Sequence, residues 1–449
     1  FVATLPGVGL PPNVDAQYAG YLPVFEDSLR NNGSLFFWYF EAQAHADKPL
    51  VLWINGGPGC SSMSDGLWAE LGPYRADANG AVSVNPTAWT NVANVLFVDQ
   101  PVGTGFSFAV DEVYAESEQE VDTMFLAWLA RWLEVFAPNG RRIILSGESY
   151  AGIYLPSFAT AILDRMPQVT LEGIAIGNGW TDAAIQSATY ATFAYGVGLI
   201  GASQYRVLDA QSQVCLAEAR AYDPANAEDT WPTTCDEVFN SIFAASGSPP
   251  NNSVNVYDVR LYDPTGGDVY PTPAVNAVAY LNQTAIRSAL HVPAGVQSFA
   301  ECSDPVYDAL ADDAYISTVG LLPGLIAATR VLLYNGQFDF ICNHLGTSEY
   351  LENLAMSSPQ QAELLTADRV QWQHAPGVTA GYAKTAGNLT FLLALGGGHM
   401  YPYDQGAAAL DMITRFMEGR SFESAFEPIS GSAPSSPPHH SPVTVSLTV

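Results

Sequence analysis

The stretch Gly147-Glu148-Ser149-Tyr150-Ala151-Gly152 decides the fold that we predict for this chain. It directly follows the β-branched run 141–146, which is typical of a buried strand, and it precedes the apolar segment 153–166, which is typical of a helix. A strand, a sharp turn and a helix in this order lift a serine hydroxyl above the edge of a sheet. Ala151 stands where the usual motif has a second glycine, and an ordinary tight turn fits the same residues. Support for a nucleophilic Ser149 must therefore come from elsewhere in the chain.

Two further residues supply the groups that a serine nucleophile needs. Such a serine requires a base that takes its proton and an acid that orients the base. Asp339 follows the strand-like run 330–336, and His399 follows the strand-like run 389–395 and three glycines. Of the seven histidines, only His399 is approached in this way. The order Ser149, Asp339, His399 along the chain is the order found in α/β-hydrolases.

A glycine loop completes this predicted machinery. The apolar run 50–54 predicts a strand, and Asn55-Gly56-Gly57-Pro58-Gly59-Cys60-Ser61-Ser62 follows it. Hydrolases of this fold take one oxyanion donor from an upstream loop of this kind and the other from the residue after the nucleophile. We therefore expect the backbone N–H groups of Gly57 and Tyr150 to hold the oxyanion.

These segments, together with 99–107, 339–343 and 398–402, resemble the serine carboxypeptidases over residues 15–420. The resemblance implies an enzyme that releases C-terminal amino acids from peptides and proteins at acidic pH through an acyl-enzyme. Ser149 would be the nucleophile, His399 the base and Asp339 the orienting acid, with no metal ion or other cofactor. Tyr401 and Ile153 depart from residues common in the family, which bears on fine specificity.

The resemblance also implies a site for the free carboxylate of the substrate, formed by residues matching Asn55, Gly56, Glu70 and Glu148. Two close and poorly solvated carboxyl groups cannot both ionise cheaply, so one of them keeps a proton and donates a hydrogen bond. That proton leaves at higher pH, and the site then repels its substrate. Activity at acidic pH follows from this arrangement.

The five cysteines leave one thiol over. Cys215 and Cys235 enclose a polar stretch that a disulfide would staple, and the family resemblance supports a second bridge from Cys60 to Cys302. Cys342 is then free, either as an inert apolar filler or as a residue of the substrate pocket.

Trp180 and Met400 are the other residues that we expect in the substrate pocket. The segment 178–182 resembles the fungal processing carboxypeptidases that trim Lys or Arg, whereas Trp180 itself favours an apolar pocket. The sequence leaves the side-chain preference open.

Composition restricts the partners and the compartment. Lys and Arg number 16 against 45 Asp and Glu, for a formal charge of −29, which argues against nucleic acid and anionic membrane surfaces as partners.

No apolar run is long enough to span a bilayer, and the chain opens like a processed N-terminus. We expect a secretory-pathway protein, secreted or vacuolar, whose partners are peptide and protein C-termini; its oligomeric state stays open. If the chain enters that pathway, sequons for glycosylation stand at Asn32, Asn251, Asn282 and Asn388.

The expected architecture is an α/β-hydrolase fold, with a central, mostly parallel and twisted sheet flanked by helices. Strands are predicted at 35–40, 50–54, 92–99, 142–145, 171–176, 330–334 and 389–395, and the apolar stripe within 120–136 predicts a helix that packs on the sheet. Residues 1–180 and 311–428 would form the two parts of the core, 181–310 an inserted cap, and 429–449 a Ser/Pro-rich tail.

Two alternatives to peptide hydrolysis are a different enzyme activity and a non-catalytic binding function. An acyltransferase on the same scaffold would pass the acyl group to an alcohol instead of water. A binding protein that has lost catalysis is disfavoured, because the triad, the oxyanion loop and the carboxylate site are all present.

Overall fold

The structure is a computed structural model that describes residues 1–423, except 3, 25–32, 45, 138–139, 224–225, 227–228, 248–252 and 264–270. The expected tail at 429–449 and the sequons at Asn32 and Asn251 lie outside the described residues. No helix within the described part of the chain is long and apolar enough to cross a membrane.

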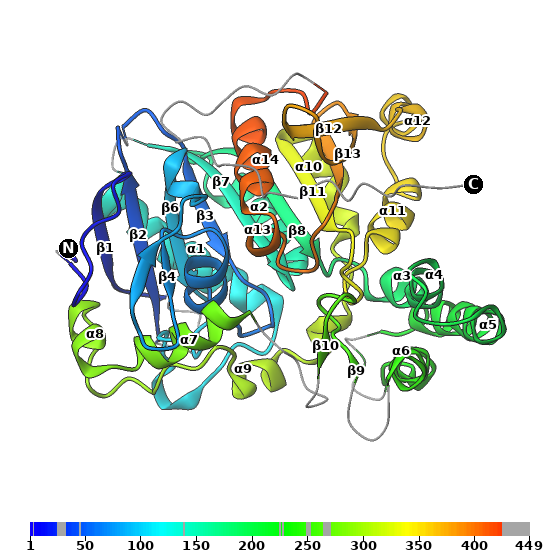
Figure 1. The fold of residues 1–449 in the computed structure, drawn as a ribbon, viewed down its shortest axis with the longest axis horizontal. Helices are drawn as coiled ribbons and strands as arrows, with labels where there is room; N and C mark the ends of the chain where they lie inside the picture. Colours follow the sequence, from blue (N-terminus) through cyan, green and yellow to red (C-terminus); the bar gives the residue numbers. More distant parts are fainter. Residues whose placement is uncertain are drawn as a thin grey trace, which may run out of the picture.

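A ten-stranded sheet runs through the middle of the molecule, in the order β1-β2-β6-β3-β7-β8-β11-β14-β13-β12 (Figure 1). The strands from β6 to β14 in this order pair in parallel, and antiparallel strands extend the sheet at both edges. The strands of this sheet are β1 (Val14–Pro23), β2 (Ser34–Ala42), β3 (Leu50–Ile54), β6 (Asn94–Asp99), β7 (Arg142–Ser149), β8 (Thr170–Gly179), β11 (Arg330–Gly336), β12 (Val370–Ala375), β13 (Val378–Ala386) and β14 (Leu389–Ala394). Two small ribbons pair β4 (Tyr74–Ala76) with β5 (Val82–Val84) and β9 (Ser253–Val254) with β10 (Tyr262–Asp263).

Helices cover both faces of the sheet, and further helices stand at one end of it (Figure 1). They are α1 (Glu118–Phe136), α2 (Ala151–Arg165), α3 (Ala183–Ala188), α4 (Tyr190–Gly196), α5 (Ala202–Ala219), α6 (Thr233–Ser246), α7 (Thr272–Leu281), α8 (Thr284–Ala289), α9 (Asp304–Ala309), α10 (Leu322–Ala328), α11 (His344–Glu352), α12 (Ser358–Thr366), α13 (Tyr401–Asp404) and α14 (Gly406–Glu418). Shorter or irregular helical segments are the π-helix η1 (Met63–Glu70) and the 3₁₀ turns η2 (Trp89–Asn91), η3 (Val110–Glu112), η4 (Asp312–Tyr315) and η5 (Val319–Leu321).

Burial on both faces explains why the central strands read as continuous apolar runs. Every residue of β3 is fully buried: Leu50, Leu52 and Ile54 face the core that contains α1 and α2, while Val51 and Trp53 face the core that contains α14 and η1. This alternation follows from the two-residue period of a strand, and helices on both faces are the usual way to bury a parallel sheet. The α/β-hydrolase architecture that the sequence predicts is confirmed.

The region expected to form a cap is built from two kinds of structure. Helices α3 to α6 pack on one another around their own apolar cluster, which contains Tyr190, Phe193, Val238 and Phe340. In contrast, α7 packs on η1 and β4, where Tyr280 lies against the ring of Trp68, and α7 and α8 contribute to the apolar core on the η1 face of the sheet. The disulfide between Cys215 and Cys235 joins α5 to α6.

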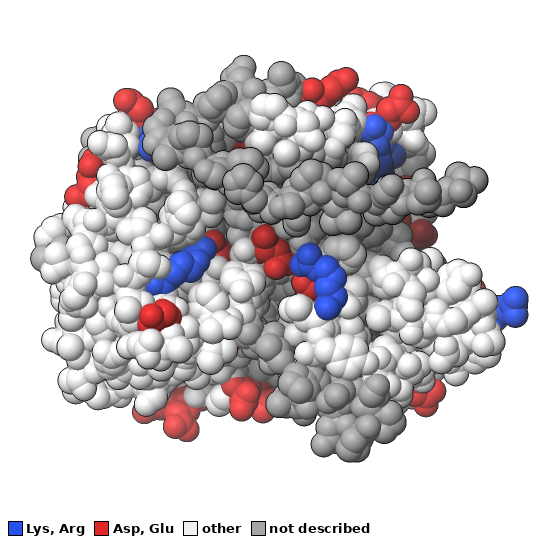
Figure 2. Space-filling model, in the orientation of Figure 1, with Lys and Arg blue, Asp and Glu red and all other residues white. Residues whose placement is uncertain are grey.

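All seven expected strands are present, with boundaries that differ by a few residues. The strand predicted at 92–99 begins at Asn94, because the N–H groups of Val92 and Ala93 donate to the carbonyl of Trp89 and end a 3₁₀ turn there. Strands β1, β12 and β13 at the edges of the sheet were not expected. Figure 2 shows acidic side chains along the outline of this face and also near its centre, where they lie beside basic ones.

Candidate active site

Ser149 stands at a sharp turn between a central strand and a helix. It is the last residue of β7, and α2 begins two residues later. Its φ of 63° lies in the left-handed region, which a residue with a side chain adopts only when the surroundings impose it. The N–H of Trp180 donates to the Ser149 carbonyl at 2.7 Å and holds this turn against the end of β8. The expected strand, sharp turn and helix around Ser149 are therefore present, with Ala151 in place of the second glycine.

The glycine loop after β3 packs directly on this elbow. A Cβ at Gly56 would lie 2.4 Å from the backbone nitrogen of Tyr150 and 2.9 Å from Cβ of Ser149. Glycine at this position is what lets the loop approach so closely. Gly57 follows with a φ of 112°. The two backbone groups expected to hold the oxyanion, those of Gly57 and Tyr150, thus belong to two segments in direct contact.

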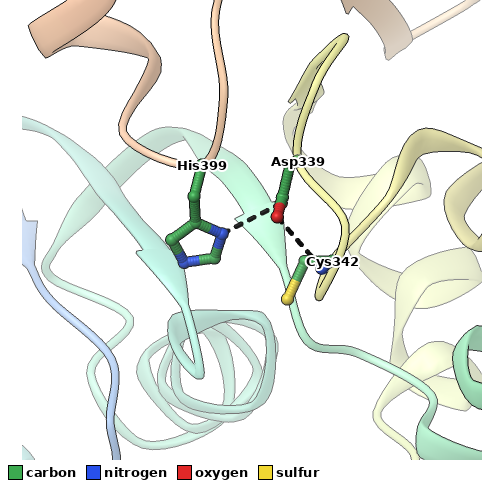
Figure 3. A group of neighbouring side chains, drawn as sticks. All are labelled: Asp339, Cys342 and His399. Carbon is green, nitrogen blue, oxygen red and sulfur yellow. Dashed lines mark hydrogen bonds and ion pairs between the residues drawn. The ribbon is translucent and has the colours of Figure 1, made fainter. Parts of the chain in front are cut away.

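Asp339 and His399 form a buried pair across neighbouring strand ends (Figure 3). Nδ1 of His399 lies 2.9 Å from Oδ2 of Asp339, and the two side chains are 3% and 0% exposed, respectively. An ionised carboxylate only accepts hydrogen bonds, so it selects the tautomer with the proton on Nδ1 and leaves Nε2 as an acceptor. The N–H of Cys342 donates to the other Asp339 oxygen at 3.4 Å.

A third side chain holds Asp339, and sequence analysis did not assign it this role. Nδ2 of Asn178 donates to Oδ2 of Asp339 at 2.7 Å, and its Oδ1 accepts from the N–H of Gly336 at 3.2 Å. Asn178 has a φ of 44°, a conformation that asparagine tolerates better than most residues. An asparagine between two glycines at the end of a strand is the signal that could have identified it.

Glu70 and Glu148 form a carboxyl pair beneath the site. They are 1% and 2% exposed, Glu70 ends η1, and Glu148 immediately precedes Ser149. The two carboxyl groups lie close enough to interact, and a hydrogen bond between them requires a proton on one of them. Burial is the main cause that raises the pKa of Glu148 well above its usual range, and the neighbouring Glu70 adds to it. Burial also raises the pKa of Glu70 to about 7.

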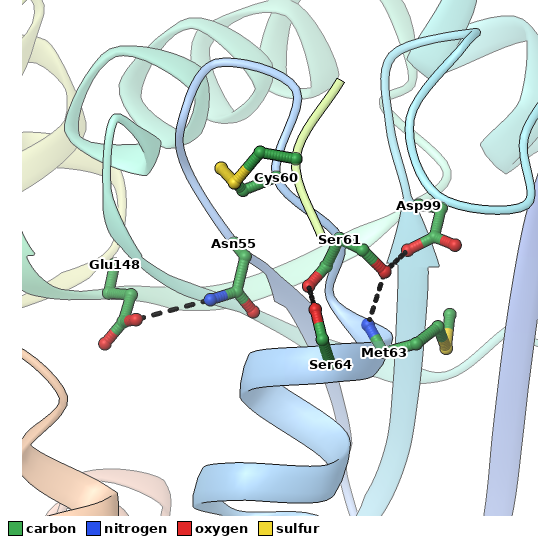
Figure 4. The surroundings of a disulfide bond; sticks show 8 residues. Asn55, Cys60, Ser61, Met63, Ser64, Asp99 and Glu148 are labelled. Atoms are coloured by element: carbon green, nitrogen blue, oxygen red, sulfur yellow. Dashed lines mark hydrogen bonds between the residues drawn. A yellow bond between two sulfur atoms is a disulfide. The ribbon is translucent and has the colours of Figure 1, made fainter. Parts of the chain in front are cut away.

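The orientation of Asn55 is set by its neighbours, as Figure 4 shows for its contact with Glu148. Its Oδ1 accepts from Nε1 of Trp53 at 2.6 Å and from the N–H of Gly66 at 3.1 Å. These two donors oblige Nδ2 to face the other way, where it donates to Oε1 of Glu148 at 3.3 Å. Asn55 thus presents a donor beside the buried pair.

A cavity of about 360 Å³ gathers most of the expected site residues. Its lining includes Asn55, Gly56, Gly57, Glu148, Ser149, His399 and Met400, together with Cys60, Cys302, Ser303, Asp304, Tyr307, Tyr257, Ile341, Pro58 and Asp65. Glu70, Tyr150 and Asp339 are not part of this lining. Asp65 was not expected here, and Glu301 beside it was also missed.

Two residues expected in the substrate pocket lie outside the cavity lining. Nε1 of Trp180 donates to the carbonyl of Ala314 at 2.6 Å, which turns the indole toward the η4 segment. Cys342 is a free thiol, 2% exposed, packed beside Asp339 and His399 (Figure 3). The disulfides expected between Cys60 and Cys302 and between Cys215 and Cys235 are both formed.

The two described sequons differ in setting. Asn282 is half-buried, and its Nδ2 donates to the carbonyls of Val278 and Phe299. Asn388 is exposed, and its Nδ2 donates to the carbonyl of Ile326.

A family model described as serine carboxypeptidase matches residues 6–419 of this chain. The chain belongs to the serine carboxypeptidase family. It is a serine-type carboxypeptidase with the α/β-hydrolase fold.

Relatives of this carboxypeptidase match over most of its length. Serine carboxypeptidase S10 family member 2 of Dictyostelium discoideum is 38% identical, over 97% of this chain and 79% of the relative. The pheromone-processing carboxypeptidase kex1 of Aspergillus fumigatus is 36% identical, over 93% of this chain and 68% of the relative. The crystal structure of the prohormone-processing carboxypeptidase Kex1(Δ)p from Saccharomyces cerevisiae superposes with a TM-score of 0.82 at 28% identity, covering 93% of this chain and 94% of that one.

Proposed function

We propose that Ser149 is the nucleophile of this carboxypeptidase, that His399 is its base and that Asp339 orients the imidazole. The hydroxyl oxygen attacks the carbonyl carbon of the last peptide bond while Nε2 of His399 takes the hydroxyl proton. The tetrahedral intermediate collapses, the C–N bond breaks, and His399 gives the proton to the departing amine. Water then repeats the sequence on the acyl-enzyme and releases the shortened peptide.

The backbone N–H groups of Gly57 and Tyr150 stabilise the oxyanion of both tetrahedral intermediates. The support is the packing of Gly56 on the Tyr150 nitrogen, which brings the loop and the elbow together before substrate arrives. Donors fixed in advance need no reorganisation when charge develops, which is the usual advantage of such a site.

The buried Glu70–Glu148 pair beside Ser149 is the observation that favours an exopeptidase. A fully ionised pair would repel the carboxylate at the C-terminus of a peptide. A carboxyl pair that retains a proton can instead donate a hydrogen bond to that carboxylate. Asn55 adds its Nδ2 donor, and Gly56 leaves room for close approach of the terminal group. The four residues form the proposed carboxylate site, which would hold the last peptide bond over Ser149.

The natural substrates are proposed to be the C-termini of peptides and proteins, in a secreted or vacuolar setting. Two disulfides suit an oxidising compartment, and a carboxyl pair that must retain a proton suits an acidic one. The yeast and Aspergillus relatives are named as processing carboxypeptidases of prohormones and pheromones, which supports peptide substrates.

One experiment tests the serine and the carboxylate site together. The enzyme is treated with an organophosphonate at acidic pH, and the labelled residue is located by mass spectrometry. A peptide and its C-terminal amide are then compared as substrates of untreated enzyme. We expect the label on Ser149 and a preference for the free acid. A label elsewhere would remove the nucleophile assignment, and equal turnover of acid and amide at every pH would remove the carboxylate site.

A further inference from the structure

One arginine closes the end of η1 that carries Glu70. Arg75 lies in β4, and its guanidinium donates to four backbone carbonyls around that end, those of Trp68, Glu70, Gly72 and Tyr74. Nη1 lies 2.9 Å from the Tyr74 carbonyl oxygen and 3.3 Å from those of Trp68 and Gly72. The last carbonyls of a helix lack partners within the helix, and a cation placed beside them is favourable. Arg75 therefore holds the backbone from which the Glu70 carboxyl group projects.

Asn85 supports the same turn without a charge. Its Nδ2 donates to the carbonyls of Glu70 at 3.3 Å and Gly72 at 2.9 Å, and its Oδ1 accepts from the N–H of Thr87 at 3.1 Å. Because Asn85 and Arg75 share two acceptors, their side chains lie next to one another. The two side chains that hold Glu70 thus differ in charge.

The positive charge of Arg75 is not part of an ion pair. Within the part of the chain that the structure describes, no carboxylate is ion-paired with Arg75, and its four acceptors are neutral carbonyls. Burial lowers the pKa of Arg75 to about 10, and the charge of Glu70 acts in the opposite direction. Arg75 therefore remains a cation at acidic and neutral pH, and its charge acts on Glu70.

Titratable groups from several elements lie around this end of η1. The Glu70 carboxyl group interacts with Glu148 at the end of β7 and with Arg75, and His399 acts on it when the imidazole is protonated. The other groups are Asp65 on η1, Tyr334 in β11, Tyr403 and Asp404 in α13 and Asp99 at the end of β6, whereas α7 carries no acidic or basic residue. Of the groups that act on Glu70, Arg75 is thus the permanent cation.

We propose that Arg75 is a positioning residue that confines the binding of a peptide C-terminus to acidic pH. It holds the backbone of Glu70, and its charge favours the ionised form of the Glu70–Glu148 pair. Without that cation, the buried pair would keep its donating proton to a higher pH. The proposal rests on the proposed carboxylate site, whose pH range Arg75 would set.

The direction of the effect follows from the charges. Burial is the main cause that raises the pKa of Glu70 to about 7, and Arg75 opposes that rise. The donating form of the pair exists below that pH and is lost as pH climbs through it. A neutral residue in place of Arg75 removes the opposing influence, so the donating form should persist to higher pH. The variant should therefore gain binding near neutral pH, which damage to the fold would not produce.

The test follows the ratio of kcat/KM for a peptide and for its C-terminal amide across the pH range. Both substrates use the same base, so the ratio cancels the titration of His399 and reports on the carboxylate site. Arg75→Gln removes the charge. Arg75→Lys keeps the charge, although its ammonium has three donors for four carbonyls.

Arg330→Gln is the matched control. Arg330 closes the end of α14 in the same way, by donating to the carbonyls of Phe416 and Met417, and it lies at the opposite end of β11 from Asp339. Its replacement removes a guanidinium from a helix end that is remote from the site.

In wild type the ratio should decline as pH climbs through about 7. In Arg75→Gln the midpoint of the decline should move upward by about one pH unit, because a nearby opposite charge shifts a carboxyl group by about that much or more. Arg75→Lys and Arg330→Gln should keep the midpoint of wild type.

An unchanged midpoint in Arg75→Gln would overturn the proposal. An equal shift in Arg75→Lys would do the same, since the fit of the guanidinium and not its charge would then matter. Both results leave the wild-type difference between acid and amide in place. They are therefore distinguishable from failure of the carboxylate site, in which wild-type acid and amide give the same curve and the proposal falls with that site.

Should Arg75→Gln fail to fold, Asn85→Asp decides the question. This variant keeps the acceptor for Thr87 and places a carboxylate next to Arg75, which neutralises the charge of the arginine without removing its side chain. The same upward shift of the midpoint is expected, and an unchanged midpoint in a folded Asn85→Asp enzyme would overturn the proposal.

Discussion

Asn178 and Asp339 lie 2.7 Å apart, from Nδ2 to Oδ2, although 161 residues separate them in the chain. The oxygen that accepts from Asn178 is the same one that accepts from His399. The amide therefore holds the carboxylate in the position from which it orients the imidazole. Asn178 is a positioning residue in this scheme.

Asn178→Asp tests this role because it keeps the shape and the left-handed backbone conformation while replacing the donor by a second acid. At low pH the introduced carboxyl group is protonated and still donates to Asp339, whereas at higher pH the two carboxylates repel one another. We expect kcat/KM to approach the wild-type value at acidic pH and to fall by about 10-fold or more as pH rises. A fall that is uniform across the pH profile would instead indicate a purely structural defect.

Ser149→Ala should abolish hydrolysis while leaving the fold intact, since only binding and the oxyanion donors remain. The expected loss in kcat is at least about 10³-fold, measured on a peptide substrate, with circular dichroism as the control for folding. His399→Ala should do comparable damage and Asp339→Ala somewhat less. A Ser149→Ala enzyme with a tenth of wild-type turnover would contradict the mechanism.

Glu148→Gln should change how peptide binding responds to pH. The pKa of Glu70 is raised to about 7, so the protonated, donating form of the pair exists below that pH and is lost as pH climbs through it. KM for a free-acid peptide should therefore rise toward neutral pH in wild type. In Glu148→Gln an amide donor replaces the shared proton, so binding should be weaker at low pH and its pH dependence flatter.

The C-terminal amide of the same peptide is the control for this experiment. It lacks the terminal charge, so its KM should vary less with pH in both enzymes. Superimposable pH curves for acid and amide would show that the Glu70–Glu148 pair does not bind the terminal carboxylate.

Cys342 should be the one titratable thiol of the described cysteines. Its side chain is 2% exposed, and burial is the main cause that raises the pKa of its thiol well above the usual range. Native enzyme should react slowly with a thiol reagent at neutral pH, because the thiolate is the reactive form. One equivalent should react after denaturation without reductant, and peptide mapping should place it at Cys342. Two further thiols would exclude one of the two disulfides.

The central strands and their terminal loops could be predicted from the sequence because strands buried on both faces are apolar throughout and end at glycine or a polar residue. The edge hairpin of β12 and β13 was not predicted. One face of these edge strands is exposed to water, so exposed residues such as Gln371 and Tyr382 alternate with buried ones and no continuous apolar run results.

The proposed triad of Ser149, Asp339 and His399 could be predicted from the sequence because each residue stands at or shortly after a recognisable strand end. Asp65 and Glu301 could not be found in this way. They are far apart in the chain, their residue types are common on surfaces, and the disulfide and the Ser61–Glu301 hydrogen bond bring them together only in the folded molecule.

The separation between helices α3 to α6 and the sheet has an evolutionary consequence. Among the described residues, those that line the cavity come from the strand-end loops and from segments after residue 256, and none comes from 183–246. These helices bury most of their apolar side chains among themselves, but they also support the loop that carries Asp339, where Tyr190 stacks on Phe340 and donates to the carbonyl of Ile341. The solvent-exposed faces of these helices, away from that loop, are therefore a natural place for related enzymes to acquire new surfaces around a common catalytic centre.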